Sequence, residues 1–388
     1  NSMTVRITKP EFNLREKLTE LDKPTGLKGS ELMRSNTIQE ARNLIGAGRK
    51  NLVINGSFKV DQRHSGGMVT ATQGIYGADR WKSINSNNSK FSMNRDGDAS
   101  TANGNFTTYM RLTTTSAHTV GSSQFFLLWQ TIESKDIFDR TGFGQSDAKD
   151  LSLSFWVRSS VAGPFSGSLE NTSQNRCFVW EVNINQPNVW EYKTVHIPPE
   201  PVGSWTRNSA SGAAYLMFSM GTTITEPPNI WRNSQGLGTA TEVKRIEISG
   251  ATLDLTGIQL EIGKKSTEFE YLTFTEDLLR CSRYYQRIEG YSDLIMFGSG
   301  RANGVNNAQV AVPLNVPLRT TPTIPSLDYS TWGVSGANAV TDGQPTVTRW
   351  YEDSSIVHLG FPTSSLDNGR TAVVSCRNGS TLELNSEL

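Results

Sequence analysis

The sequence predicts a mainly β protein with short N-terminal helices and two β-sandwiches joined by a helical connector. Only 36% of the residues are hydrophobic, 19% are charged and 34 are glycine, which is typical of short strands joined by polar turns. Apolar and polar residues alternate over long stretches. A length of 388 residues suffices for two or three domains. We expect segments at 1–48, 49–272, 273–290 and 291–388.

Two short amphipathic helices are predicted within residues 1–48. In 11–22, leucines at i, i+4 and i+7 form one apolar stripe that 23–26 ends. A second helix begins near Thr37, where Glu40 has capping-box spacing, and stops at 46–48. Such short helices need a partner, which can be the rest of this chain, another copy or a larger assembly. The apolar residues available for docking are Leu14, Leu18, Leu21, Ile38 and Leu44.

The middle of the chain, 49–272, shows the alternation of half-buried strands. In 150–160, Leu151, Leu153, Phe155 and Val157 share one face. Further strands are expected at 88–95, 107–115, 124–133, 176–185, 190–197, 213–220 and 243–248, a spacing that suits a two-sheet sandwich. In 251–262 the alternation slips by one residue at Thr256 and Gly257, which predicts a long bent strand with a β-bulge.

Residues 273–290 interrupt the β pattern and predict a helix. Thr273 and Glu276 have capping-box spacing, and Gly290 ends the run. After it, alternation returns in 308–317, where Pro313 favours an edge strand, and in 355–361, 370–376 and 380–385. This predicts a second, smaller sandwich of about eight strands.

The residues give no positive case for an enzyme, a metal site or a cofactor. His64, His118, His196 and His358 are isolated from one another, and the three cysteines are too far apart in the sequence for a zinc site or a disulfide framework. Glu261, Glu268 and Glu270 are interpreted as surface residues. A net charge of zero provides no general attraction to nucleic acid, and no apolar run reaches the roughly 20 residues that span a bilayer.

The aromatic residues are the most informative candidates. Trp129, Trp156 and Trp180 lie in alternating strands and are interpreted as core. Trp190, Trp205 and Trp231 lie in loop-like segments, where an exposed indole can stack on a sugar ring or else cover the base of a loop. The same two alternatives hold in the last segment for Tyr329, Trp332, Trp350 and Tyr351.

An ordered set of short motifs resembles a known family. NLVINGSF (51–58) resembles the opening strand of galactose-binding-like, carbohydrate-binding jelly rolls, and GIQLEIG (257–263) followed by FEY (269–271) resembles their closing strand. With ADRW (78–81), CSRYYQR (281–287) and PLRTTPT (317–323), the order is similar to a bacteriophage tail-fibre family. The segments 4–26 and 43–51 resemble the N-terminal part of such proteins in marine phages.

The resemblance implies a homotrimeric virion protein, made in the host cytoplasm, whose N-terminus docks to the portal, tail or capsid. Its jelly roll would recognise a host-surface polysaccharide. A purely architectural virion component is the alternative, and a capsule depolymerase is the least favoured. Calcium-binding members carry acidic residues where this chain has Thr256 and Gly257, so no metal is expected.

Overall fold

The computed structural model describes residues 34, 41, 49–97, 106–135, 137–289, 295–304, 306–325, 332–335, 339–340, 345–349, 351, 354–362, 369, 371–376 and 381–388. The chain divides into two compact units, Asn1–Lys50 and Asn51–Leu388. The predicted docking residues Leu14, Leu18, Leu21, Ile38 and Leu44 lie outside the described residues. The description below therefore concerns the second unit.

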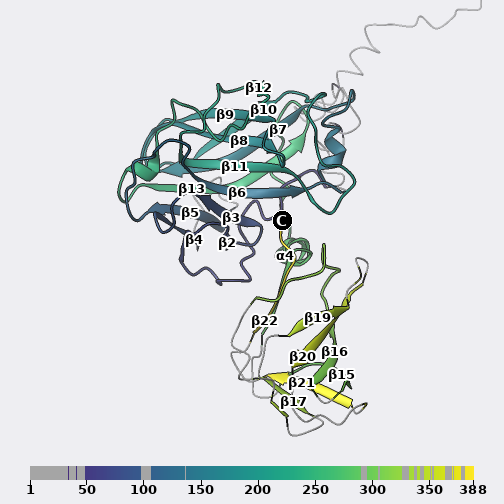
Figure 1. Cartoon of the computed structure of the whole chain (residues 1–388). Coiled ribbons are helices and arrows are strands. Elements are labelled where there is room, and N and C mark those ends of the chain that lie inside the picture. Colours follow the sequence, from purple (N-terminus) through teal and green to yellow (C-terminus); the bar gives the residue numbers. More distant parts are fainter. Residues whose placement is uncertain are drawn as a thin grey trace, which may run out of the picture. The chain divides into compact units, whose positions relative to one another are not determined.

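Two antiparallel sheets form a β-sandwich (Figure 1), which confirms the predicted fold class. Sheet A has the order β1-β4-β5-β13-β7-β10, and sheet B the order β12-β9-β8-β11-β6-β3-β2. Many neighbouring strands are distant in sequence, as in jelly rolls. Sheet A contains β1 (Val69–Thr70), β4 (Phe91–Gly97), β5 (Thr108–Thr114), β7 (Leu151–Ser159), β10 (Glu191–Ile197) and β13 (Thr252–Ile262). Sheet B contains β2 (Tyr76–Ala78), β3 (Trp81–Asn85), β6 (Phe125–Glu133), β8 (Gly163–Asn171), β9 (Cys177–Ile184), β11 (Gly212–Thr222) and β12 (Trp231–Arg232).

The core lies between the two sheets and is built from the predicted alternation. The apolar set of β7, from Leu151 to Val157, is fully buried. The ring centroid of Phe155 lies 5.4 Å from that of Trp180 on β9 and 5.3 Å from that of Phe218 on β11. Burying a large apolar side chain contributes roughly 1.5–3 kcal/mol, so such contacts join the sheets.

The bulge predicted in the closing strand is present. The pairing of β13 with β7 shifts register between Thr256 and Gln259, and Gly257 has a φ of 59°. A Cβ at Gly257 would lie 2.6 Å from the ring of Phe106, so both the backbone and the packing require glycine there. Apolar residues before and after the bulge consequently face the same core.

Residues 51–58 form an irregular segment, so the predicted opening strand is wrong. The segment contains a tight turn, in which the Phe58 amide donates to the Asn55 carbonyl (3.1 Å). It is Asn55, with a φ of 58°, rather than Gly56 that adopts the left-handed conformation. The segment nevertheless lies beside the end of β13, because the Leu52 amide donates to the Leu260 carbonyl and the Ile258 amide to the Gly56 carbonyl.

Helix α4 (Phe274–Ser282) begins with the predicted capping box formed by Thr273 and Glu276. It is shorter than the predicted helix of 273–290, because β14 (Tyr285–Glu289) follows and pairs with β22 (Thr381–Asn385). Tyr284 and Tyr285 are almost fully buried by this turn of the chain. Tertiary packing therefore overrides the helical pattern beyond Ser282.

The last part of the chain forms a seven-stranded antiparallel sheet, besides the β14-β22 ladder. Its order is β18-β17-β21-β15-β16-β20-β19. Pro313 ends β16, which is an interior strand between β15 and β20, so the predicted edge position is wrong. The strands are β15 (Ile295–Ala302), β16 (Asn307–Pro313), β17 (Trp332–Ser335), β18 (Ala339–Val340), β19 (Thr346–Arg349), β20 (Ile356–Pro362) and β21 (Thr371–Cys376).

Two local features differ from the predicted strand pattern. Residues 243–248 contain the short helix η2 (Arg245–Glu247) rather than a strand, and a second short helix, η1 (Phe138–Thr141), precedes β7. Strand β8 was not predicted because serine and glycine dilute its apolar pattern. At Gly167 within it, a Cβ would lie 2.2 Å from the indole of Trp180.

In the described part of the chain, no helix combines the length and apolar character needed to cross a membrane.

Candidate functional site

The outer face of sheet A carries the side chains that alternate with the core set. The pairing places Tyr192 of β10 beside Trp156 of β7 in one row. In the next row, Arg158 of β7, Asp254 of β13 and Arg111 of β5 are neighbours. Strand pleating therefore brings residues from four strands onto one surface. We call this surface the Tyr192 face and define it as Tyr109, Arg111, Trp156, Arg158, Trp190, Tyr192 and Asp254.

The exposed aromatic surface of this face comes from Trp156 and Tyr192. Their ring centroids lie 5.4 Å apart, Tyr192 is 45% exposed and Trp156 is half-buried. Tyr109 and Trp190 are buried beside them, with ring centroids 5.6 Å apart in an edge-on arrangement. The face thus presents an accessible aromatic pair beside a rigid aromatic cluster.

Two guanidinium groups share one buried carboxylate on the Tyr192 face. Asp254, only 1% exposed, accepts hydrogen bonds from Arg111 Nε (2.8 Å) and Nη2 (2.9 Å) and from Arg158 Nε (2.8 Å). The hydrogen bonds to Asp254 raise the pKa of Arg111. The Arg158 guanidinium lies 4.7 Å from the ring centroid of Trp190 and 5.2 Å from that of Tyr109. Both cations are therefore held in place.

Two buried polar atoms near this face have no hydrogen-bonding partner within the described part of the chain. They are the indole Nε1 of Trp190 and the side-chain oxygen of Asn94, whose backbone pairs with Arg111. The two unpaired atoms lie below the surface, whereas the aromatic rings and the fixed guanidinium groups form a surface that can stack on a ring and hydrogen-bond to its substituents.

Of the three predicted sugar-binding tryptophans in the first sandwich, one, Trp190, lies beside this exposed pair. Trp190 belongs to the Tyr192 face but is 8% exposed, and Trp205 is also 8% exposed, so their burial favours the alternative that they cover the bases of loops. Trp205 and Trp231 pack together with centroids 5.9 Å apart, and Trp231 Nε1 donates to the Pro198 carbonyl (3.0 Å). As folded, Trp190 and Trp205 offer no ring face to a sugar.

The predicted aromatic residues of the last segment are only partly described. Tyr329 and Trp350 lie outside the described residues, and for Trp332 only its backbone, in β17, is described. Tyr351 is 63% exposed. No contact that would bring these four side chains together is established, and their predicted role stays a prediction.

The alternation in β7 already predicts that Trp156 faces outward. Because Leu151, Leu153, Phe155 and Val157 face the core, Trp156 must face outward. The interpretation of Trp156 as core is therefore wrong, whereas Trp180 is fully buried as expected. Tyr192 follows from the same rule, because Val195 and Ile197 face the core and even-numbered residues of β10 do not.

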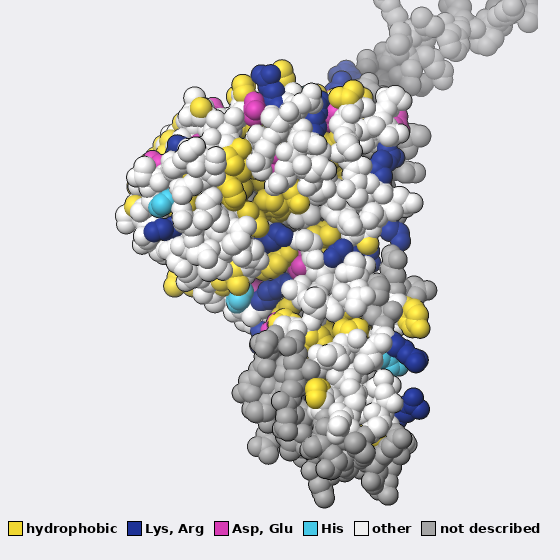
Figure 2. All heavy atoms as spheres, viewed as in Figure 1, with side chains coloured by type: hydrophobic (Ala, Val, Ile, Leu, Met, Phe, Trp, Pro, Cys, Tyr) yellow, Lys and Arg dark blue, Asp and Glu magenta, His cyan; other side chains and the backbone are white. Residues whose placement is uncertain are grey.

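The outer face of sheet B is the second candidate surface. Leu127, Trp129 and Met217 are buried there by surrounding chain, while Tyr215 is partly exposed and its ring centroid lies 4.1 Å from that of Trp129. Figure 2 shows hydrophobic side chains gathered in a hollow over the part of the sandwich where β8, β11 and β6 are labelled in Figure 1. This surface is more apolar and less exposed than the Tyr192 face.

Glu170 lies on the outer side of sheet B, paired with Tyr215 of β11 and Cys177 of β9. It is fully buried, and neither carboxyl oxygen has a hydrogen-bonding partner in the described ranges. Burial raises its pKa to about 8, an effect that the backbone amide of Gly236 only partly offsets. Glu170 is therefore an uncharged acid at neutral pH.

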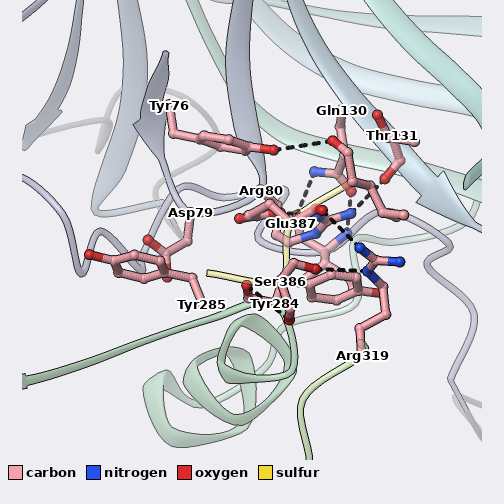
Figure 3. Close-up of polar contacts among 12 residues, drawn as sticks. Tyr76, Asp79, Arg80, Gln130, Thr131, Tyr284, Tyr285, Arg319, Ser386 and Glu387 are labelled. Atoms are coloured by element: carbon pink, nitrogen blue, oxygen red, sulfur yellow. Dashed lines mark hydrogen bonds and ion pairs between the residues drawn. The ribbon is translucent and has the colours of Figure 1, made fainter. Parts of the chain in front are cut away.

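A third polar cluster joins the sandwich to the last part of the chain (Figure 3). Glu387 pairs with Arg80 and with Arg63, and Arg80 also donates to the Thr131 carbonyl (2.6 Å). Arg319 donates to the carbonyls of Ser386 and Glu387, each at 2.8 Å. We call these residues, with Asp79 and Tyr284, the junction network.

The junction network is a structural element rather than a binding site. The Arg80 guanidinium lies 3.6 Å from the ring centroid of Tyr284. Burial would raise the pKa of Glu387, but Arg80 and Arg63 outweigh it and hold the pKa below its usual range. Burial raises the pKa of Asp79 to about 6, against the effects of Arg63 and Gln62. These charges compensate one another inside the protein.

Metal and nucleophile candidates remain dispersed. Within the described ranges, no three His, Cys, Asp or Glu residues gather as a metal site would require. The thiols of Cys177 and Cys281 are buried and free, and burial raises the pKa of both.

Glu261 is fully buried and accepts from the Thr267 amide (2.7 Å), so its interpretation as a surface residue is wrong. Glu268 is exposed as expected.

Comparison with known proteins gives no family for this chain. No protein-family model and no curated protein matches it. Among solved structures, the enzymatically active domain of bacteriophage CBA120 tailspike protein 4 is similar over 55% of this chain and 21% of that chain, with 13% identity and a TM-score of 0.30. The chain thus spans about a fifth of that tailspike domain's length.

Carbohydrate-binding modules show the same distant likeness. TmCBM61, solved with β-1,4-galactotriose, is similar over 55% of this chain and 100% of its own length, with 10% identity and a TM-score of 0.29. The family 11 module from Clostridium thermocellum is similar over 51% of this chain and 97% of its own, with 13% identity and a TM-score of 0.25. At such scores, what these proteins bind does not transfer to this chain.

Proposed function

We propose that this chain binds a glycan through the Tyr192 face. The observation that carries the proposal is the partly exposed Trp156–Tyr192 pair, 5.4 Å apart, next to the two guanidinium groups fixed by Asp254. A sugar ring has an apolar face of C–H groups that stacks on aromatic rings, while its hydroxyl groups need donors and acceptors at the edge. The Tyr192 face supplies both.

The preformed nature of the face supports this proposal. The pair stands on neighbouring strands of a sheet, and the arginines are held by hydrogen bonds of 2.8–2.9 Å to a buried carboxylate. Little side-chain freedom is lost when a ligand binds to such a surface. The chain is accordingly proposed to bind without chemical conversion, as a non-enzymatic protein.

The wider proposal is a phage virion appendage, a tail fibre or similar structure. It rests on the ordered motifs at 51–58, 78–81, 257–263 and 317–323 and on the apolar stripes of residues 1–48, which would dock to other virion proteins. A homotrimer is part of this proposal. Sedimentation equilibrium at micromolar concentration should give three times the chain mass, and a monomer would contradict it.

Glycan binding can be tested with a labelled preparation of the full chain on an array of bacterial surface polysaccharides and neutral oligosaccharides. Trp156→Ala and Tyr192→Ala should each weaken binding of the recognised glycan about tenfold, since each removes one stacking partner. Affinities would be measured by isothermal titration calorimetry.

Two matched controls identify the face that binds. Phe274→Ala removes another exposed aromatic ring, from helix α4, and should leave binding unchanged. Tyr215→Ala tests the outer face of sheet B in the same way. Wild-type protein that binds no glycan would refute the function, whereas loss of binding in Tyr215→Ala alone would move the site to sheet B.

A purely architectural role is the alternative function. The burial of Trp190, Trp205 and much of the aromatic surface favours packing as their role. In that case Trp156→Ala and Tyr192→Ala would alter assembly without altering any adsorption to cells. Incubation with host polysaccharide, followed by measurement of chain length, should detect no cleavage if the chain lacks enzymatic activity.

A further inference from the structure

We infer that the glycan recognised by the Tyr192 face is acidic and that its carboxylate or sulfate group pairs with Arg158. This inference rests on the proposed glycan-binding function and assigns the ligand class of the same site. It follows from the charges around the exposed rings, where the arginine side chains are more exposed than the carboxylate that they share.

The charge next to the exposed rings is positive. Asp254 carries one negative charge and is hydrogen-bonded to two arginines, Arg111 and Arg158. It is 1% exposed, whereas the side chains of Arg111 and Arg158 are 34% and 21% exposed. An incoming ligand therefore meets the two cations and not the carboxylate, and the triad has a net charge of +1.

The other charged groups around the face do not cancel this charge at the rings. Asp96 accepts from the Tyr109 hydroxyl (2.9 Å) and lies 3.8 Å from Arg111, but it stands on β4, three strands from β7. At about 4.8 Å per strand, the backbones of β4 and β7 are roughly 14 Å apart, so the ion pair of Asp96 is with Arg111 and not with Arg158. On β10 and beside it, Glu191 pairs with Lys193 (2.6 Å) and His196 with Asp150 (2.7 Å), so these acids already have partners.

Arg158 is placed to meet a substituent of a stacked sugar. It is two residues from Trp156 on the same face of β7, a separation of about 7 Å along the strand. Its Nε is used by Asp254, while its two terminal nitrogens make no hydrogen bond to any residue that the structure describes. A guanidinium with both terminal nitrogens available binds a carboxylate or sulfate through two parallel hydrogen bonds. The rings would position the sugar, and Arg158 would select its charge.

The test compares ligands that differ only in charge. We would titrate the full chain with oligogalacturonate and its methyl ester, and with a sulfated galactan oligosaccharide and its desulfated form, by calorimetry at 50 mM NaCl. The acidic member of at least one pair should bind about tenfold more tightly than its neutral counterpart. The preference should shrink at 500 mM NaCl, because salt screens a partly exposed pair.

Variants assign the preference to one side chain. Arg158→Gln should abolish the preference for the acidic ligand, so that the charged and neutral members of a pair bind equally, while Trp156 and Tyr192 remain to stack on either one. Asp254 keeps Arg111 as a partner in this variant, and a thermal unfolding curve would verify that it folds. Arg301→Gln, which removes an exposed arginine from β15, is the matched control and should retain the preference.

The possible failures are distinguishable. Equal binding of acidic and neutral ligands, or a preference that persists in Arg158→Gln, would overturn the inference and leave the glycan-binding function standing. If neither these ligands nor the glycans of the array bind at all, the proposed function itself fails. Loss of the preference in Arg301→Gln as well would show that overall charge, rather than Arg158, selects the ligand.

Discussion

Glu170 illustrates how much a single residue's surroundings change its chemistry. In water its carboxyl group would be ionised at neutral pH, but inside the outer layer of sheet B it holds its proton up to about pH 8. A buried polar group without a hydrogen bond costs free energy, and a buried charge costs more. Glu170, at a position flanked by Tyr215 and Cys177, therefore lowers the free energy of unfolding.

The stability of the protein should depend on pH through Glu170. In the unfolded chain this group releases its proton near its ordinary pKa of 4.5, whereas in the folded chain it does so near 8. Between these values the folded state binds more protons, so the free energy of unfolding falls as pH rises from about 4.5 to 8. Glu170→Gln should flatten this dependence and stabilise the protein at pH 8 by about 1–3 kcal/mol.

Urea unfolding at pH 5, 6.5 and 8 measures this effect. Glu268→Gln, a change at an exposed glutamate, serves as the control and should follow the wild-type pH profile. An unchanged slope in Glu170→Gln would show that another group causes the pH dependence.

At the scale of elements, β13 is the strand on which sheet A depends, because it pairs with both β5 and β7. Its bulge keeps one apolar face toward the core along its whole length. Gly257→Ala should destabilise the protein by about 2–4 kcal/mol, because a Cβ would combine an unfavourable φ of 59° with a contact of 2.6 Å to Phe106.

Gly250→Ala separates the loss of stability caused by the backbone conformation from the loss caused by packing against Phe106. Gly250 also has a positive φ, 74°, but a Cβ there would meet no atom within 4 Å. It should cost only about 1–2 kcal/mol, the backbone contribution. Equal losses in the two variants, measured by chemical unfolding, would show that packing against Phe106 has no role.

The sequence predicted the elements whose cause is local and missed those whose cause is tertiary. The bulge at Gly257 and the capping box of α4 follow from neighbouring residues, and both are present. The strand β14 is formed by pairing with β22, almost a hundred residues later, which no local pattern contains. The exposed position of Trp156 on the Tyr192 face could be predicted from the sequence, because alternation in β7 places this side chain on the outer face of the sheet. Its proximity to Arg158, two residues along β7, follows from the same alternation, whereas its proximity to Asp254 depends on the register between β7 and β13, which neither strand shows alone.

At the scale of the whole second unit, the junction network couples the sandwich to the last part of the chain. Glu387→Gln should leave Arg80 without its counter-charge, while Arg63 keeps Asp79, and should cost about 3–5 kcal/mol. In differential scanning calorimetry we expect one unfolding transition for the wild-type second unit and two for this variant, as the two parts lose their coupling.

Glu289→Gln is the control for that experiment. It breaks the pair between Arg287 and Glu289, whose carboxylate is 31% exposed, and should cost no more than about 1 kcal/mol. Similar calorimetric profiles for the two variants would mean that the junction network does not couple the parts.

The junction network should also affect the order in which parts of the protein fold. Arg80 and its partner Glu387 are 307 residues apart, so during synthesis the cation is made long before its counter-charge. Until then Arg80, Arg63 and the Tyr76 ring stay open to water or to wrong partners. The seating of residues 386–388 against the sandwich should therefore be a late step of folding.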